Sequence, residues 1–343
     1  MKKLLILFGG ESNEHDVSNI SAYNILTKID KDKYDITKIG ITKDGKWYLA
    51  DCALEDIKSG EWTEKVKYEA IISPSKNHKG IMILKDSKTE YREIDVCFPI
   101  IHGTNGEDGT IQALLKLAGI KRVGADFLSS AMGMDKKISK IIFENAGIPV
   151  VPAVYTYSED DWEKVLEKME LPVFVKPANS GSSVGCYTVT QQKDLKPAIK
   201  EALKVDKCVL VEKFIDCREV ECGILGNEEI FVSDPGEILT DSEFYDYDTK
   251  YNNPSAVKIK IPADITEMQK TKIKEYAKRA YKALGLSGMT RADFFIDRKT
   301  DDIYLNEVNT IPGFTSLSMY PMLLTNSGYS YSGLIDKLIE LAQ

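Results

Sequence analysis

Cysteine and histidine are scarce in this chain, and long apolar segments are absent. The six cysteines include no CxxC pair and the three histidines show no metal-ligand spacing, so neither a dense disulfide framework nor a zinc site is expected. No run approaches the ~20 apolar residues of a membrane-spanning helix. The start, MKKLLILFGG, has too short an apolar run for a signal-peptide core. We therefore expect a cytoplasmic protein with reduced thiols and no membrane partner.

An excess of basic residues is also missing. With 45 Lys and Arg against 53 Asp and Glu, the formal net charge is −8. Nucleic acid is not expected as the main partner, because binding to phosphate backbones needs a basic surface. A local basic site for a small anion stays open. The 343 residues suffice for two or three domains with buried cores.

The order of apolar and helical patterns predicts an α/β protein in three units. Apolar runs alternate with helical stretches over 1–124, as in an α/β domain, and we expect a central unit over 125–210 and a third over 211–343. Strands are expected at 4–8, 36–41, 94–101, 173–176, 186–190, 209–215, within 219–232, and at 291–297 and 303–308. Helices are expected at 17–29, 110–118, 134–146, 267–284 and 332–341, with a helix and a hairpin within 51–93.

Residues 233–256 are predicted to form a long irregular stretch. Loops of this length in compact domains are usually functional lids or disordered linkers. The stretch contains four aromatic residues, which is unusual for a linker: Phe244, Tyr245, Tyr247 and Tyr251. We therefore interpret 233–256 as a lid.

Two predicted strands carry polar side chains at alternate positions near their ends. Arg291 and Asp293 lie two apart in RADFFID, and Glu307 and Asn309 lie two apart in LNEVNTIPG. Because alternate side chains of a strand share a face, pairing of the strands would gather Asp293, Glu307 and Asn309. Two carboxylates and an amide form the hard-ligand set that Mg²⁺ accepts when a substrate's phosphates complete its shell. Solvated residues on an outer strand face are the alternative.

A glycine-bracketed turn and three charged residues indicate an anion site. GSSVG at 181–185 could wrap a phosphate with backbone N–H groups, although a tight hairpin looks the same and no GxxxxGK[ST] loop is present. Lys176 ends the preceding apolar strand, where a buried amine needs an anion. Glu212 and Lys213 in VLVEKFI would point to opposite faces, and they either belong to an edge strand or line a nucleotide.

Two further loops follow predicted strands at the end where open α/β sheets bind ligands. FGGESNEHDVS, 8–18, carries Glu14, and HGTNGEDGT, 102–110, carries His102 and an acidic pair. Each is a weak signal alone, since a Glu at such a place also fits the first turn of a helix.

The motifs occur in a fixed order along the whole chain: GGESNEHDVS, HGTNGEDGT, MDKKISK, VKPANSGSSVG, VEKFI, EFYDYDTKY, RADFF and NEVNTIPGFTSLS. Together they closely resemble those of the D-alanine–D-alanine ligase family, a branch of the ATP-grasp enzymes. The resemblance implies a Rossmann-like N-terminal domain and two ATP-grasp domains of α+β type, with ATP between two antiparallel sheets. It also implies a homodimer, and a reaction in which ATP phosphorylates one D-alanine carboxylate and the amine of a second D-alanine displaces the phosphate.

The resemblance assigns the nucleotide and metal positions. Two Mg²⁺ ions, or Mn²⁺, are implied at Asp293, Glu307 and Asn309. The positions implied for ATP are Lys136, Lys176, Ser182, Ser183, Glu212, Lys213, Ile215, Glu219 and Phe244.

The resemblance likewise assigns the amino-acid substrates. Glu14 matches the carboxylate that holds the first D-alanine's ammonium group, beside His102, and Ser182 and Tyr251 would link Glu14 to the lid. Arg291 and the N–H of Gly313 match the site for the tetrahedral oxyanion, where only glycine allows the close backbone approach after Pro312. The second substrate's carboxylate is implied at Ser318 and Lys250.

Substrate choice rests on fewer residues. Tyr251, where ligases that use D-lactate are expected to carry His, favours an amine nucleophile. Met319, where D-alanine–D-serine ligases often carry Arg, favours a methyl group, although apolar pockets reject an added hydroxyl weakly. A D-alanine–D-serine ligase is therefore the alternative, followed by an ATP-grasp ligase with other substrates. A regulator without catalysis would be expected to lack Arg291 or a metal ligand, and neither is missing.

Overall fold

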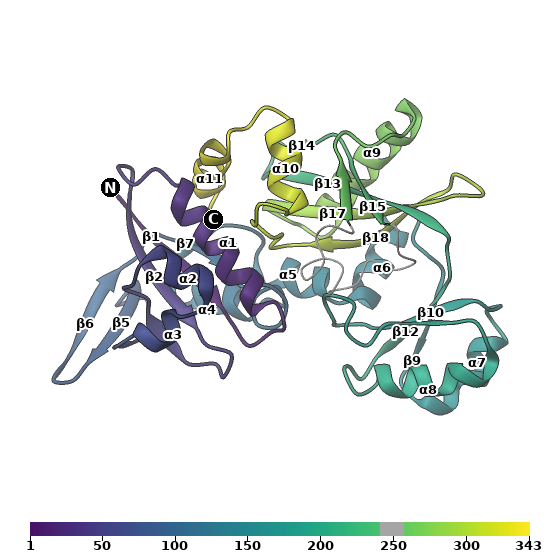
Figure 1. The fold of residues 1–343 in the computed structure, drawn as a ribbon, viewed down its shortest axis with the longest axis horizontal. Coiled ribbons are helices and arrows are strands. Elements are labelled where there is room, and N and C mark those ends of the chain that lie inside the picture. Colours follow the sequence, from purple (N-terminus) through teal and green to yellow (C-terminus); the bar gives the residue numbers. More distant parts are fainter. Residues whose placement is uncertain (241–256) are drawn as a thin grey trace.

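The computed structural model describes residues 1–240 and 257–343, and these form three β-sheets connected by helices (Figure 1). In Figure 1 the first sheet lies at the left, the second at the lower right and the third at the upper right. The α/β fold class predicted from the sequence is confirmed. The unit boundaries at 124/125 and 210/211 stay predictions.

The first sheet has a parallel centre and an antiparallel extension, in the order β6-β5-β4-β3-β2-β1-β7-β8. Parallel pairs join β1 (Lys2–Gly9), β2 (Tyr34–Ile41), β7 (Val96–Ile100) and β8 (Lys121–Arg122). The extension consists of β3 (Trp47–Leu49), β4 (Glu69–Ile72), β5 (Gly80–Lys85) and β6 (Lys88–Glu93). Its helices are α1 (His15–Lys28), α2 (Leu54–Ser59), α3 (Trp62–Lys65) and α4 (Thr110–Ala118).

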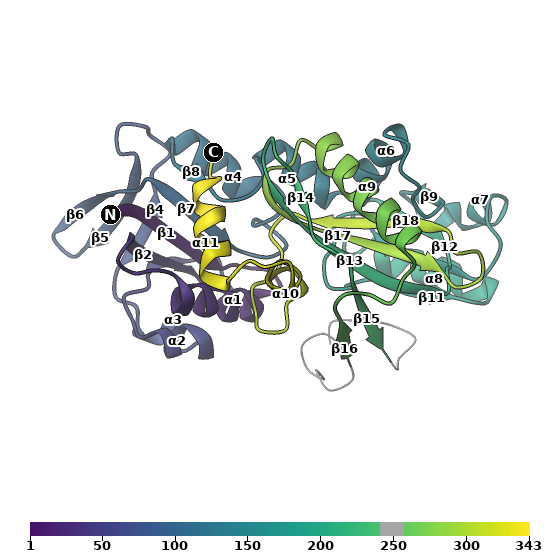
Figure 2. The same cartoon turned by 90° about the horizontal axis from the view of Figure 1, so that it is seen from above.

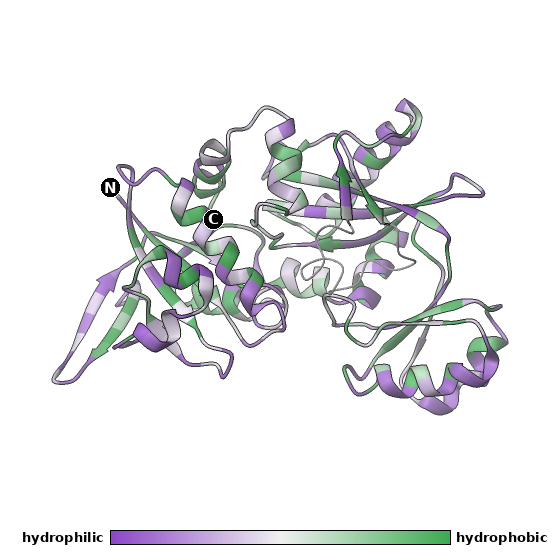
Figure 3. Cartoon of the chain, in the orientation of Figure 1, coloured by the Kyte–Doolittle hydropathy of each residue, from purple (hydrophilic) through white to green (hydrophobic). Residues whose placement is uncertain are grey.

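The centre of this sheet is apolar on both faces, as expected for parallel strands covered by helices. Residues 4–8 of β1 are fully buried, whereas β6 at the edge alternates between exposed and half-buried positions and is hydrophilic (purple in Figure 3). The predicted strands and helices of 1–124 are confirmed, including the helix and hairpin within 51–93. The short strands β3 and β4 were not predicted.

The second sheet is antiparallel, in the order β11-β10-β12-β9. Its strands are β9 (Ala153–Thr156), β10 (Val173–Pro177), β11 (Tyr187–Val189) and β12 (Val209–Lys213). One face packs on α7 (Trp162–Leu166) and α8 (Gln192–Ala202), and the short η1 (Glu159–Asp161) precedes α7. Because β12 lies between β10 and β9, the edge-strand interpretation of Glu212 and Lys213 is wrong, while their opposite orientation is confirmed: Glu212 is buried and Lys213 exposed.

The third sheet is antiparallel, in the order β16-β15-β13-β17-β18 with β14 beside β13. Its strands are β13 (Cys217–Gly226), β14 (Phe231–Val232), β15 (Gly236–Thr240), β16 (Val257–Lys260), β17 (Gly288–Asp297) and β18 (Ile303–Asn309). Helix α9 (Glu267–Ala283) covers one face (Figure 2). It starts at a capping box of Thr266 and Gln269. Figure 1 shows the other face turned towards the second sheet.

The prediction of an irregular stretch over 233–256 is wrong for 236–240, because these residues form β15 and pair with β13 and β16. Residues 241–256 of the predicted lid, which include Phe244, Lys250 and Tyr251, lie outside the described residues.

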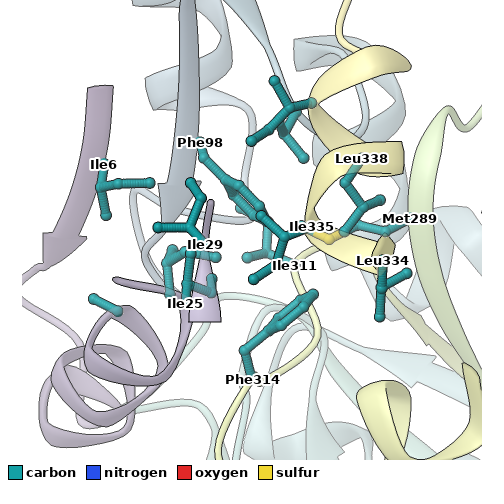
Figure 4. Packing of buried hydrophobic residues seen from close by; sticks show 14 of the residues in the cluster. Ile6, Ile25, Ile29, Phe98, Met289, Ile311, Phe314, Leu334, Ile335 and Leu338 are labelled. Carbon is teal, nitrogen blue, oxygen red and sulfur yellow. The ribbon is translucent and has the colours of Figure 1, made fainter. Parts of the chain in front are cut away.

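The remaining helices connect the three sheets. Helices α5 (Phe127–Met134) and α6 (Lys136–Asn145) link the first sheet to the second, and α10 (Met319–Asn326) follows β18. The final helix α11 (Tyr331–Glu340) returns to the first sheet, where Leu334 and Leu338 pack in one core with Ile6 and Phe98 (Figure 4). Within residues 1–240 and 257–343, every helix is too short or too polar to span a bilayer.

Candidate functional site

Three neighbouring strands of the third sheet bring the predicted metal residues to one face. Asp293 of β17 lies opposite Glu307 of β18 on one side and opposite Glu221 of β13 on the other. Arg291 lies opposite Asn309 in the next row. The two rows therefore hold three carboxylates, one amide and one guanidinium, and the prediction that Asp293, Glu307 and Asn309 converge is confirmed.

A β-bulge turns the end of β18 towards this face. The register shifts between Asp293 and Phe294, so that Asp293 opposes Glu307 while Phe294 opposes Leu305, and Asn306 is the extra residue. Leu305 is fully buried in the core on the α9 side. Strict alternation would send Glu307 into the same core as Leu305, and the bulge reverses the phase so that Glu307 and Asn309 face the other way.

Arg291 is held by two carboxylates. Its Nε and Nη2 donate to the two oxygens of Asp293 at 2.7 Å each, and Nε lies 2.8 Å from Oε2 of Glu221. Asn309 Nδ2 donates to Asp293 at 2.9 Å. Burial alone would lower the pKa of Arg291, but Asp293 and Glu221 raise it well above its ordinary value, so the guanidinium stays charged.

Helix α6 supplies two lysines one turn apart, Lys136 and Lys140. Asp135 caps the helix by accepting from the backbone N–H groups of Lys137 and Ile138, which fixes Lys136 in the first turn. Lys136 Nζ donates to the Ser180 carbonyl at 2.6 Å and lies 3.3 Å from Glu307. Burial favours the neutral amine, yet Glu307 raises the pKa of Lys136 above its ordinary value.

One turn later, Lys140 belongs to a buried charge triad. Glu212 accepts from Lys140 and from Lys176 at 2.8 Å each, and Lys140 also donates to the Val151 carbonyl at 3.1 Å. Burial acts to raise the pKa of Glu212, but the two ammonium groups lower it. Burial lowers the pKa of Lys140. With two positive charges and one negative, the triad carries one excess positive charge beside the cavity that Lys176 lines.

The turn at 180–185 has strained backbone where it approaches the first domain. Ser182 and Ser183 have φ values of +50° and +58°, which cost non-glycine residues about 1 kcal/mol or more each. In this conformation the Ser182 hydroxyl donates to Glu14 at 2.7 Å, across 168 positions of sequence. The strain is therefore localised at the predicted phosphate turn.

Side chains of the first domain hold the backbone on both sides of Gly313. Glu107 accepts from the N–H of Ile311 at 2.9 Å and of Gly103 at 3.0 Å, and His102 Nδ1 contacts the Ile311 carbonyl at 2.9 Å. Ser21 accepts from the N–H of Phe314 at 3.1 Å. Burial and the nearby Glu14 raise the pKa of Glu107 to about 7, and burial lowers the pKa of His102.

After Gly313 the chain turns back on itself. The hydroxyl of Ser318 accepts from the Thr315 N–H at 2.9 Å, and a Cβ at Gly313 would lie 2.7 Å from that hydroxyl. Gly313 thus lets the turn approach Ser318 more closely than any other residue would.

These side chains line two adjoining cavities. The larger, about 760 Å³, lies between the second and third sheets and is lined by Lys176, Ser183, Glu212, Lys213, Ile215, Glu219 and Asp293. The smaller, about 250 Å³, reaches the first domain and is lined by Glu14, His102, Arg291, Asn309, Gly313, Ser318 and Met319. Both are lined by Lys136, Ser182, Glu221 and Glu307, so the cavities meet at these residues.

Family comparisons agree with this arrangement. The protein-family model "D-ala D-ala ligase N-terminus" matches residues 3–125, and "D-ala D-ala ligase C-terminus" matches 142–340. The chain belongs to the D-alanine–D-alanine ligase family. It is similar to D-alanine–D-alanine ligases of Acetivibrio thermocellus, at 48% identity over 99% of this chain and 96% of the relative, and of Thermoanaerobacter sp. strain X514, at 49% over 99% and 96%.

Solved structures of ligases in the family share the fold. The VanG D-Ala:D-Ser ligase from Enterococcus faecalis superposes with a TM-score of 0.90 and 39% identity over 99% of both chains. The D-alanine–D-alanine ligase from Coxiella burnetii has a TM-score of 0.85 and 34% identity, covering 100% of this chain and 95% of that one. The predicted family and its ATP-grasp fold are therefore confirmed.

The donor set fits the divalent ions that the ligase family implies. Among the described residues, no three His, Cys, Asp or Glu side chains group as a metal site. Asp293 and Glu307 with Asn309 would instead offer hard oxygen donors to an ion that keeps further ligands on a substrate's phosphates. The assignment of individual ligand and substrate roles stays a prediction.

Four residues of the ligase site were not predicted: Glu107, Lys140, Glu221 and Asn306. Lys140 lies four positions after Lys136, and Glu221 two after Glu219, so helical and strand periodicity could have indicated both. Glu107 belongs to the acidic pair noted in the 102–110 loop. Asn306, whose amide oxygen accepts from Lys176 at 3.2 Å, reaches the cavity through the bulge.

Proposed function

We propose that this chain joins two D-alanines to D-alanyl-D-alanine with consumption of ATP, as a step in making peptidoglycan precursors. The observation that carries the proposal is the junction of the two cavities at Lys136, Ser182 and Glu307. A nucleotide in the larger cavity would present its terminal phosphate where a small amino acid in the other cavity presents its carboxylate.

The charged groups at the junction suit phosphoryl transfer, which depends mainly on positioning and charge neutralisation. Lys136 and Lys176 would neutralise phosphates, and Lys213, Ile215 and Glu219 would line the nucleoside. Mg²⁺ or Mn²⁺ on Asp293, Glu307 and Asn309 would supply further neutralisation of the polyphosphate.

The first D-alanine would bind by its ammonium group to Glu14, which Ser182 orients. After transfer of the γ-phosphoryl group, the neutral amine of the second D-alanine would attack the acyl phosphate carbon. The C–O bond to phosphate would then break, and the nitrogen would lose a proton to the departing phosphate. Arg291 and the N–H of Gly313 would stabilise the oxyanion of the tetrahedral intermediate. Ser318 would receive the second carboxylate.

The second candidate is a D-alanine–D-serine ligase, since the VanG D-Ala:D-Ser ligase from Enterococcus faecalis is 39% identical to this chain. Met319 favours D-alanine, because it is 4% exposed and packs over Gly236, which leaves an apolar wall beside Ser318. We also propose a homodimer in the cytoplasm, as expected for the family.

Chromatography of the products tests the function. Purified protein with saturating ATP, Mg²⁺ and D-alanine should yield D-alanyl-D-alanine, ADP and phosphate, and L-alanine should yield none. Equal D-alanine and D-serine in one reaction should give mainly D-alanyl-D-alanine. A predominance of D-alanyl-D-serine would favour the second candidate, and no dipeptide at all would reject both.

A further inference from the structure

Glu221 lies at the centre of the site without a role in the proposed chemistry. It is 5% exposed, opposite Asp293 in the strand register, and it lines both cavities where they meet. A buried carboxylate at such a junction is costly unless a positive group neutralises it. Among the residues that the structure describes, Arg291 supplies such a group, and its Nε lies 2.8 Å from Oε2 of Glu221.

Arg291 depends on a second residue that has another predicted task. Both oxygens of Asp293 accept from the guanidinium, and one of them also accepts from Asn309. A carboxylate offers about four lone-pair sites, so three are already used. If Asp293 also binds a divalent cation, the cation neutralises its attraction for Arg291 and repels the guanidinium directly.

Glu221 can keep Arg291 in place under those conditions. Among the described residues it is the other carboxylate at ion-pair distance from Arg291. It projects from β13, whereas the predicted cation ligands project from β17 and β18. Its negative charge therefore lies on the side of Arg291 away from Glu307 and Asn309.

We propose that Glu221 is a positioning residue whose carboxylate holds the Arg291 guanidinium at the oxyanion position when Asp293 is engaged by the cation. The inference rests on the proposed ligase function and deepens it. Glu221 acts through Arg291 and does not itself contact the reacting carbon.

The test is Glu221→Gln, which keeps the size of the side chain and removes its charge. The turnover number should fall at least about 10-fold, because the loss affects the transition state. The Kd for ADP, measured calorimetrically without turnover, should stay within about 3-fold of wild type, since none of the phosphate-facing lysines is changed. Glu221→Asp, which keeps the charge on a shorter side chain, should restore part of the turnover.

A matched control removes the charge of another buried carboxylate of the same sheet that also binds an arginine. Glu237 of β15 accepts from Arg218 at 2.6 and 2.7 Å, is 3% exposed, and lies on the opposite face, outside both cavities. Glu237→Gln should lower the melting temperature at least as much as Glu221→Gln and leave turnover unchanged.

The decisive comparison is a double-mutant cycle with Arg291→Lys. If Glu221 acts through Arg291, adding Glu221→Gln to Arg291→Lys should lower turnover by less than about 2-fold further. Additive losses would overturn the proposal, as would a Glu221→Gln enzyme with wild-type turnover or one whose loss is matched by lost ADP binding. A wild-type protein that forms no dipeptide would reject the proposed function, and the inference with it. Should Glu221→Gln fail to fold, the same cycle run with Glu221→Ala, which also removes the charge, decides in the same way.

Discussion

The charge triad of Lys140, Glu212 and Lys176 makes a quantitative prediction for Lys140→Met. This substitution keeps an apolar stem of similar length and removes one of the two ammonium groups that contact Glu212 at 2.8 Å. Breaking a buried pair costs about 3–5 kcal/mol when the remaining charge has no partner. Glu212 would retain Lys176, so we expect a smaller loss of about 1–3 kcal/mol, part of it from the unpaired Val151 carbonyl.

The larger effect should be on nucleotide binding. In Lys140→Met the triad would fall from one excess positive charge to neutral, so Lys176 would no longer bring net positive charge to the cavity. At an effective dielectric constant of about 20 and a separation of about 8–10 Å, one unit charge contributes roughly 2 kcal/mol. The affinity for ADP should therefore fall about 10- to 30-fold.

Calorimetric titration with ADP and thermal melting of the free protein measure the two effects separately. Lys137→Met is the control, because it removes a lysine of the same helix whose amine donates to the Tyr157 hydroxyl and takes no part in the triad. Glu212→Gln should destabilise the protein more than Lys140→Met, since it leaves both lysines without their carboxylate. ADP affinity within about 3-fold of wild type for Lys140→Met, or equal destabilisation by the two variants, would refute this account of the triad.

Three further predictions concern the junction and the Gly313 turn. Gly313→Ala places a Cβ 2.7 Å from the Ser318 hydroxyl. The KM for the second D-alanine should therefore rise about 10-fold in steady-state assays, with little change in melting temperature. An unchanged KM would show that the Ser318 side chain moves aside without loss of substrate binding. Because the folded Glu107 carboxyl has a pKa of about 7 against 4.5 for its ordinary value, it retains a proton that the unfolded chain has released between these pH values. The stability of wild type relative to Glu107→Gln should therefore fall by up to about 3 kcal/mol as the pH rises through this window, and melts at pH 5 to 8 that show a constant difference would contradict it. Glu307→Gln should lower turnover by orders of magnitude while far-ultraviolet circular dichroism stays native, and near-normal turnover would remove Glu307 from the metal site.

Local patterns were enough to predict much of the fold and of the site. Period-two alternation placed Glu307 and Asn309 on one face, and the apolar runs located the central strands of all three sheets. Alternation cannot predict the bulge at Asn306. The bulge decides whether Glu307 and Asn309 point into the core or into the cavity. The strand β15 was hidden because its five residues lie within a polar stretch.

Contacts between segments far apart in the sequence could not be predicted from such local patterns. Glu107 and Ile311 are 204 positions apart, and the hydrogen bond between them depends on how the first and third sheets dock. The same holds for Glu221, whose value as a partner of Arg291 follows from strand register rather than from its neighbours in sequence. Periodicity predicts on which face of a strand or helix a side chain lies. Which side chains it contacts there follows only from the way the sheets pack together.

The return of α11 to the first sheet has a consequence for synthesis of the protein. Leu334, Ile335 and Leu338 fill the core that β1 begins, and the backbones of Arg122 and Gln343 exchange hydrogen bonds at 2.9 and 3.2 Å. A ribosome therefore releases the first strands long before their apolar covering has been translated. The nascent sheet must wait, with one side incomplete, until α11 has been translated, and a premature stop before Tyr331 would leave this sheet without that apolar covering.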